Sequence, residues 1–327
     1  MASILYLVVP CYNEQDALPH SAPRLAETLS SLQTQGRISA LSRVLLVDDG
    51  SGDDTWQIIC ALHQKQPQVF SGLKLTRNRG HQNALLAGLM AAKERADAVI
   101  SLDADLQDDT EAIGLFLAQY EAGCDIVYGV RSDRSADSAF KRATAQGYYK
   151  ALRWMGVDLI YNHADYRLMS KRALQGLAGF SEVNLFLRGM VPLLGYRTGR
   201  VEYKRGERVA GESKYPLRKM LSFAWEGITS FSVRPLQLIR TAGLALSFGS
   251  LAYLLYFIFA GRLGGGSPEL ASIWFLGSLQ LLCIGVIGEY IGKIYIETKA
   301  RPRYLIEALL ESDNSSAPAA RENPARQ

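Results

Sequence analysis

The sequence has little of several features that would assign it to common protein classes. Its four cysteines are spread singly along 327 residues, so neither a zinc site nor a disulfide framework is predicted, and a reducing compartment suits them. Lys and Arg number 36 against 32 for Asp and Glu, too small an excess for a general nucleic-acid binder. No G-x-G-x-x-G follows the first apolar run, and no Walker A sequence is present. Dinucleotide binding of the dehydrogenase type and a P-loop are therefore not expected.

A secretory leader is also not predicted. The first apolar run, residues 4–9, is six residues long and follows no basic region, so it is too short for the core of a signal peptide. We therefore expect the N-terminus to stay in the cytoplasm.

The first 130 residues alternate short apolar runs with stretches of helical period. The predicted strands are residues 4–9, 44–47, 73–75, 98–102 and 126–128, and the predicted helices lie near 14–34, 53–65, 81–94 and 109–121. Parallel neighbours need crossover connections, which helices between the strands supply. The pattern predicts an α/β domain with a doubly wound, mostly parallel sheet covered on both faces.

Polar segments follow the predicted strands, at the edge where such sheets bind ligands. They are Pro10-Cys11-Tyr12-Asn13-Glu14, Asp48-Asp49-Gly50-Ser51 and Asp103-Ala104-Asp105-Leu106-Gln107. Asp103 and Asp105 can point toward one ion, and Mg²⁺ takes one or two carboxylates plus substrate phosphates, so the pair is interpreted as a metal clamp on a diphosphate. The alternative is that these acids only begin a helix, as expected of Asp108 and Asp109. Asp48 is positioned to accept hydrogen bonds from a nucleobase or ribose.

The second half of the chain contains two long uncharged stretches, 21 residues at 241–261 and 19 at 270–288. A helix of the first length reaches roughly 31 Å, close to the bilayer's hydrocarbon thickness of about 30 Å, so two membrane spans are predicted. Two buried helices of a soluble core are the alternative. Basic residues flank the pair on both outer sides, whereas the loop between has only Arg262, which places both flanks in the cytoplasm.

The predicted organisation has four parts. They are an α/β domain at 1–214, amphipathic juxtamembrane helices at 215–240, two transmembrane helices within 241–296 (about 241–261 and 270–290), and a cytoplasmic helix with a disordered tail at 297–327. The juxtamembrane helices either lie in the membrane interface or pack on the domain.

From Leu5 to about Lys299 the chain resembles the family 2 glycosyltransferases with the nucleotide-diphospho-sugar (GT-A) fold, and more closely their polyprenyl-phosphate sugar transferases of the bactoprenol glucosyltransferase type, related to dolichol-phosphate mannose synthase. The matching segments are Val8-Val9-Pro10-Cys11-Tyr12-Asn13-Glu14, Leu46-Val47-Asp48-Asp49-Gly50-Ser51, Asp103-Ala104-Asp105-Leu106-Gln107-Asp108, Tyr128-Gly129-Val130-Arg131, Asp165-Tyr166-Arg167-Leu168 and Gly211-Glu212-Ser213-Lys214-Tyr215. One departure is Ala164-Asp165-Tyr166-Arg167-Leu168, where this branch usually has Gly-Asp-Phe-Arg-Leu. The departure concerns the identity of the sugar that is transferred.

The resemblance implies roles for particular residues. Pro10, Tyr12, Asn13, Glu14 and Asp48 would line the nucleoside pocket, while Asp103, Ala104, Asp105 and Gln107 would hold the metal and the diphosphate. Arg208, Ser213 and Lys214 would close over the phosphates, and Arg131 and Arg142 would receive the acceptor phosphate, although Arg142 is also interpretable as a surface charge. Asp165 either lines the sugar pocket or braces a turn, and His81 is predicted to cap a helix, with substrate contact as the alternative.

The resemblance also implies a reaction: an inverting, Mg²⁺- or Mn²⁺-dependent transfer of glucose from a UDP-sugar to undecaprenyl phosphate at the cytoplasmic face of the bacterial inner membrane. The catalytic domain and both termini would be cytoplasmic. The enzyme would form a homo-oligomer, and this branch of the family suggests a tetramer. The alternatives are another sugar (N-acetylhexosamine, galactose, mannose or a 4-amino-4-deoxy-arabinose derivative) or a non-catalytic membrane module that binds a nucleotide sugar.

Overall fold

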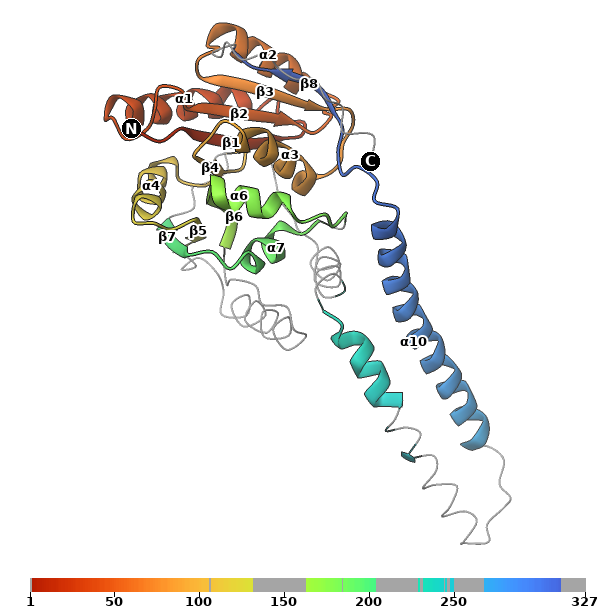
Figure 1. Cartoon of the computed structure of the whole chain (residues 1–327). Helices are drawn as coiled ribbons and strands as arrows, with labels where there is room; N and C mark the ends of the chain where they lie inside the picture. The colour runs from red at the N-terminus through yellow and green to blue at the C-terminus, as the bar shows by residue number, and fades with distance from the viewer. Residues whose placement is uncertain are drawn as a thin grey trace, which may run out of the picture.

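The structure is a computed structural model, and it describes residues 2–105, 107–131, 163–183, 185–203, 229, 232–243, 245, 248–249 and 268–312. Within these residues the centre of the molecule is one eight-stranded sheet in the order β7-β5-β6-β4-β1-β2-β3-β8 (Figure 1). Its strands are β1 (Leu5–Cys11), β2 (Arg43–Asp48), β3 (Phe70–Leu75), β4 (Ala98–Ser101), β5 (Ile126–Arg131), β6 (His163–Ser170), β7 (Thr198–Tyr203) and β8 (Ile306–Leu310).

As far as β5 the helices alternate with the strands. These helices are α1 (Leu18–Thr34), α2 (Thr55–Lys65), α3 (His81–Lys93), the short 3-10 helix η1 (Thr110–Ala112) and α4 (Ile113–Glu121). Later in the chain come α6 (Lys171–Ala178), α7 (Leu187–Leu193) and α10 (Pro268–Thr298). Each strand and helix predicted in the first 130 residues is confirmed, with ends shifted by a few residues.

The sheet is mostly parallel, as predicted. β1 pairs in parallel with β2 and β4, β2 with β3, and β5 with β7. β6 runs antiparallel between β4 and β5, and β8 runs antiparallel along β3. The carboxyl ends of β1, β2 and β4 therefore meet at one edge, which places the polar segments that follow them side by side.

Each face of the sheet carries its own apolar core, because successive side chains of a buried strand point to opposite sides. In β1, Leu5, Leu7 and Val9 pack toward α1, α2 and α4, whereas Tyr6 and Val8 pack toward α3, α6 and α7. Burial on both faces explains why the strands appear in the sequence as continuous apolar runs rather than as alternating ones.

Helix α10 is 31 residues long and projects away from the sheet (Figure 1). Among the residues that the structure describes, one window is long and apolar enough to cross a membrane, Leu279–Thr298, with a mean hydropathy of 1.4 and no buried part. Exposed side chains such as Leu281 and Ile284 argue against the alternative of a buried core helix. The predicted second span, 270–290, lies within α10, whereas the first, 241–261, lies largely outside the described residues.

The segment after α10 differs from the prediction of a cytoplasmic helix. The helix ends at Thr298, and the chain then forms strand β8, which adds to the edge of the sheet along β3. An unpaired edge leaves a row of backbone donors and acceptors, and β8 satisfies that row on β3. The predicted disordered tail lies beyond residue 312, outside the described residues.

Gly88 provides a test of how tightly α3 packs on the sheet. A Cβ atom there would overlap Val8 Cγ1 and lie 2.7 Å from Val47 Cγ2. We expect Gly88→Ala to lower the melting temperature of the purified protein, because overpacking costs about 1–3 kcal/mol and outweighs a gain in helix propensity of about 1 kcal/mol. Gly114→Ala in α4 is the control, since the neighbour there is the flexible end of Arg37. A Gly88→Ala protein that melts at or above the wild-type temperature would contradict this packing.

Candidate active site

The loops that follow β1 and β2 are locked together. Cys11 lies opposite Asp48 in the register of the two strands. Beyond them, the Asn13 backbone N–H donates to Ser51 Oγ (3.0 Å), and Asn13 Oδ1 accepts from the Gly52 N–H (3.0 Å). Asn13 has a left-handed backbone (φ 54°), which asparagine tolerates better than most residues. The loop after β1 is thus held over the end of β2.

Asp48 is fully buried at the end of β2. Its Oδ1 accepts a hydrogen bond from the Ser51 N–H (3.1 Å), whereas its Oδ2 is buried and has no hydrogen-bond partner among the described residues. A buried acceptor left without a donor is costly, so its presence needs an explanation. Pro10 is buried in β1, next to β2, and Tyr12, in the loop that follows β1, is half exposed.

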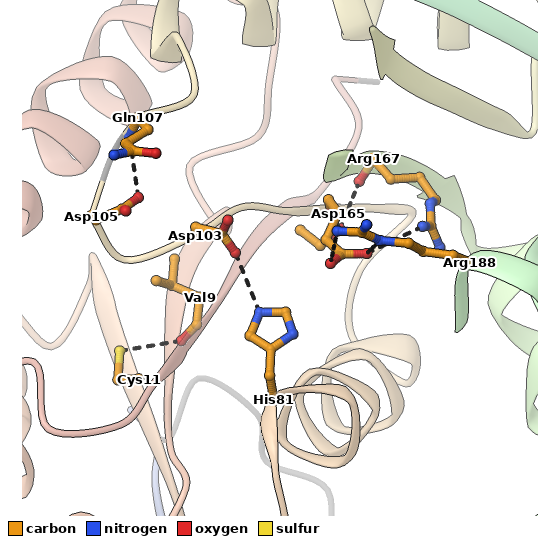
Figure 2. A network of polar contacts seen from close by, with 10 residues as sticks. Val9, Cys11, His81, Asp103, Asp105, Gln107, Asp165, Arg167 and Arg188 are labelled. Carbon is orange, nitrogen blue, oxygen red and sulfur yellow. Dashed lines mark hydrogen bonds and ion pairs between the residues drawn. The ribbon is translucent and has the colours of Figure 1, made fainter. Parts of the chain in front are cut away.

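The predicted acidic pair lies at the carboxyl end of β4 (Figure 2). Ala104 points into the core, which leaves the carboxylates of Asp103 and Asp105 on the partly exposed side of the loop. Asp103 Oδ1 lies 3.3 Å from His81 Nε2, and Asp105 Oδ1 accepts a hydrogen bond from the backbone N–H of Gln107 (3.3 Å). Among the described residues, no three His, Cys, Asp or Glu side chains cluster as a metal site.

His81 does not cap α3, so that prediction is wrong. The helix begins after Gly80 without a side-chain cap, and the imidazole instead reaches Asp103. Capping needs a short side-chain oxygen near the first free N–H groups, which imidazole does not supply. Partial burial disfavours the charged ring, but the hydrogen bond and the charge of Asp103, together with the charge of Asp165, outweigh it and raise the pKa of His81.

Asp165 is held by two arginines (Figure 2). Arg188 of α7 makes a two-pronged contact, Nε to Oδ1 at 3.1 Å and Nη2 to Oδ2 at 2.8 Å, and Arg167 Nη2 lies 3.7 Å from Oδ1. Burial alone would raise the pKa of Asp165, but Arg188 and then Arg167 outweigh burial and hold it well below its ordinary value. Ser101 Oγ donates to the Asp165 carbonyl (2.5 Å), which brings this cluster to the end of β4.

The two acids that follow the pair have different roles. Asp109 caps η1, because its side chain accepts from the Glu111 N–H, which confirms the helix-start prediction. Asp108 is buried and its Oδ1 accepts a hydrogen bond from the Tyr203 hydroxyl (2.5 Å), so it ties β7 to the loop after β4 instead.

The structure brings together only part of the predicted site. It places Pro10, Tyr12, Asn13, Glu14, Asp48, Asp103, Ala104, Asp105, Gln107 and Asp165 along the carboxyl edge of the sheet. Arg131 is the last residue of β5. Its side chain and residues Arg142, Arg208, Ser213 and Lys214 lie outside the described part of the chain. His81, Arg167 and Arg188 join the site without a predicted catalytic role.

Comparison with known proteins assigns the chain to a class: it is a glycosyltransferase. The family model described as "Glycosyl transferase family 2" matches residues 6–177, more than half of the chain, and the chain belongs to that family. A second family model, "GtrB C-terminal hairpin", matches residues 234–294. The predicted family is therefore confirmed, and the predicted non-catalytic alternative is not supported.

Full-length relatives agree with this assignment. The chain is 49% identical over 317 residues to the "Uncharacterized glycosyltransferase YkoT" of Bacillus subtilis, covering 96% of this chain and 94% of that protein. It is 41% identical over 310 residues to the "Bactoprenol glucosyl transferase" of Shigella phage SfX, covering 92% of this chain and 98% of that protein. Among solved structures, it is similar to a mannosyltransferase from Pyrobaculum calidifontis, with 18% identity, a TM-score of 0.43 and coverage of 92% and 86% of the two chains.

The Asp165 cluster predicts a pH-dependent stability. Asp165→Asn leaves buried Arg167 without its carboxylate, and removing one partner of a buried ion pair costs about 3–5 kcal/mol, so we expect a lower melting temperature at pH 7. An unfolded aspartate titrates near ~3.9, and the folded pKa lies lower. The stabilisation is therefore present above about pH 4 and is lost as the pH falls toward the folded pKa.

The melting-temperature difference between wild type and Asp165→Asn should accordingly stay constant from about pH 7 to 5 and narrow below about pH 4. Glu27→Gln, which removes an exposed carboxylate of α1, is the control and should melt like the wild type. A difference that is the same at pH 7 and pH 3 would show that Asp165 is not held ionised by the arginines.

Proposed function

We propose that this glycosyltransferase transfers glucose from UDP-glucose to undecaprenyl phosphate at the cytoplasmic face of the bacterial inner membrane. The observation that carries the proposal is the similarity to a bactoprenol glucosyl transferase across 92% of the chain, which includes both the α/β domain and the C-terminal hairpin. A hydrophobic acceptor accounts for an exposed apolar helix in the same chain as a sugar-transfer site.

The nucleoside of the donor is proposed to bind between the ends of β1 and β2. The buried Oδ2 of Asp48, which has no hydrogen-bond partner within the described part of the chain, is proposed to accept from a ribose hydroxyl or a uracil N–H. Tyr12, Asn13 and Glu14 are proposed to line this site, and the hydrogen bonds that Asn13 donates to Ser51 and accepts from Gly52 hold the two loops together.

The donor diphosphate is proposed to bind at Asp103 and Asp105 with Mg²⁺ or Mn²⁺. The side chains here fit such an ion, because they offer two partly exposed carboxylates with Gln107 beside them, and hard cations prefer oxygen ligands. Two carboxylates leave further coordination positions for phosphate and water oxygens, so such an ion does not need a three-residue cluster, which is absent among the described residues. When bound, the ion would neutralise charge on the departing nucleotide.

The acceptor needs little proton chemistry. A lipid phosphate is already anionic at neutral pH, so it can attack the anomeric carbon without a strong general base, and a direct displacement inverts the configuration. Asp165 suits this scheme: its lowered pKa makes it a poor base, and we propose that it is a fixed negative charge that orients Arg188 and the sugar. Arg131 and Arg142 are proposed to receive the lipid phosphate, and Arg208, Ser213 and Lys214 to close over the donor.

The membrane arrangement follows the same proposal. The α/β domain at 1–214, the juxtamembrane helices at 215–240 and the segment after 296 lie on the cytoplasmic side, with two spans within 241–296. The described part of the juxtamembrane segment contacts α10, since the Tyr290 hydroxyl donates to the Ser232 carbonyl (2.5 Å) and Lys293 Nζ to Thr229 Oγ1 (2.6 Å). The enzyme is proposed to act as a homo-oligomer, and its molecular mass in detergent is expected to be that of a tetramer.

Transfer of label to lipid is the direct test of substrate class. Purified protein is incubated with Mn²⁺, undecaprenyl phosphate and one radiolabelled nucleotide sugar at a time: UDP-glucose, UDP-galactose, UDP-N-acetylglucosamine and GDP-mannose. We expect label in the organic phase with UDP-glucose. Label there with another donor would correct the sugar, and label that stays water-soluble with all donors would reject the lipid acceptor.

The metal clamp is tested by charge-neutral variants. Asp103→Asn and Asp105→Asn should each reduce turnover by about 10²-fold or more, because charge stabilisation of the leaving group is lost, while the melting temperature stays near the wild-type value. Chelation with EDTA should abolish turnover, and Mg²⁺ or Mn²⁺ should restore it. Glu27→Gln is the control for loss of a carboxylate. Full activity of both aspartate variants would reject the clamp.

A further inference from the structure

The segment between α10 and β8, residues 299–305, contacts the loop that precedes α3. We name these segments the connector (299–305) and the α3 loop (76–80). Arg79 reaches the connector with two donors, Nε to the Arg303 carbonyl (2.8 Å) and Nη2 to the Pro302 carbonyl (2.7 Å). The Thr76 N–H donates to the Leu305 carbonyl (3.0 Å). The α3 loop is therefore fastened to the chain that emerges from the candidate membrane span.

The opposite side of the α3 loop packs on the segment that follows β2. The backbone N–H groups of Arg79 and Gly80 donate to the two carboxylate oxygens of Asp49, at 2.7 and 2.8 Å. Gly50 has a left-handed backbone (φ 65°), and a Cβ atom there would lie only 2.5 Å from the Arg77 carbonyl carbon. Asp49 and Gly50 directly follow Asp48, so the α3 loop packs against the residues next to the proposed nucleoside site.

The connector and the end of α10 also contact the loop between α6 and α7. Arg303 Nη2 donates to the Phe180 carbonyl, and Glu297 Oε2 accepts from the Val183 N–H (2.7 Å). Phe180 and Val183 belong to the loop that leads into α7, the helix that carries Arg188. The connector, through Arg303, and the last turn of α10, through Glu297, therefore contact the loop before α7, while Arg79 fastens the connector to the α3 loop. Figure 1 shows the chain running from α10 back to the sheet.

We infer that Arg79 is a positioning residue that couples the connector to the nucleoside pocket, so that donor affinity depends on how the connector is seated. This inference rests on the proposed function in taking the ligand of that pocket to be a nucleotide. Without the guanidinium, the α3 loop loses the two charge-assisted hydrogen bonds that fasten it to the connector. The loop then spends part of its time away from Asp49, and apparent affinity falls by the fraction of molecules that are competent to bind.

The test compares Arg79→Gln, Arg79→Lys and the control Arg24→Gln, which removes an exposed arginine of α1, all in the full chain in detergent. Hydrogen exchange is measured on peptides that cover 76–81, UDP binding with Mn²⁺ by calorimetry, and kcat and KM with UDP-glucose. For Arg79→Gln we expect exchange and the UDP Kd to rise about tenfold, with KM rising and kcat within about twofold of wild type. Lysine should restore part of the effect, because it reaches one carbonyl, and Arg24→Gln should match wild type.

The outcomes separate this inference from the proposed function. Exchange and UDP affinity that stay at wild-type values in both Arg79 variants would overturn the coupling and leave the proposed function standing. A wild-type protein that binds no UDP would refute the proposed donor, and faster exchange at 76–81 would then still support the role of Arg79 on the loop. A lower kcat with unchanged Kd would overturn the positioning role. If Arg79→Gln does not fold, Arg79→Lys decides by the same measurements.

Discussion

Parallel pairing of β1 with β2 and β4 is the constraint on which the site depends. Parallel strands end at a common edge, so Cys11, Asp48 and Ser101 come together although more than fifty residues separate the last two in the chain. The segments that follow these strands meet across short distances, as the hydrogen bonds of Asn13 with Ser51 and Gly52 show. A ligand bound at this edge, such as the proposed nucleotide, would touch loops from several strands above the packed sheet.

The acidic side chains at this edge of the sheet lie in different surroundings. Asp165 is neutralised by Arg188 and lies beside Arg167, which is buried and also sits over the Tyr128 ring at 5.6 Å. Asp103 and Asp105, in contrast, lie on the partly exposed side of their loop, where Asp103 pairs with His81 and Asp105 accepts a hydrogen bond from the Gln107 N–H. The fold thus holds Asp165 against arginine side chains and leaves the acidic pair partly exposed, as the proposed cation site requires.

Local sequence signals predicted the features that depend on short stretches of chain. The apolar runs located the first five strands, because strands buried on both faces carry continuous apolar residues, and Asp109 was predicted to start a helix because capping is local. The contacts of His81 with Asp103 and of Arg188 with Asp165 join residues about twenty positions apart, and they depend on how α3 and α7 are placed against the sheet. No local pattern marks such residues.

Strand β8 was missed for a related reason. Its five residues carry only a short apolar pattern, with Glu307 among them, and its partner β3 lies far upstream in the chain. What makes it a strand is the unsatisfied edge of β3, together with the ion pair from Lys74 to Glu307 (3.1 Å). Whether a strand edge is free to pair depends on the folded sheet, so the sequence of residues 306–310 alone does not predict β8.

The short connector has a mechanical consequence. Residues 299–305 joined to a sheet strand at one end and a helix at the other can extend to at most about 25 Å. The sheet edge therefore stays close to the end of α10 from which the connector starts. If the enzyme acts on a polyprenyl phosphate, as proposed, that phosphate lies in the headgroup layer, and the short connector would hold the sheet edge within reach of it.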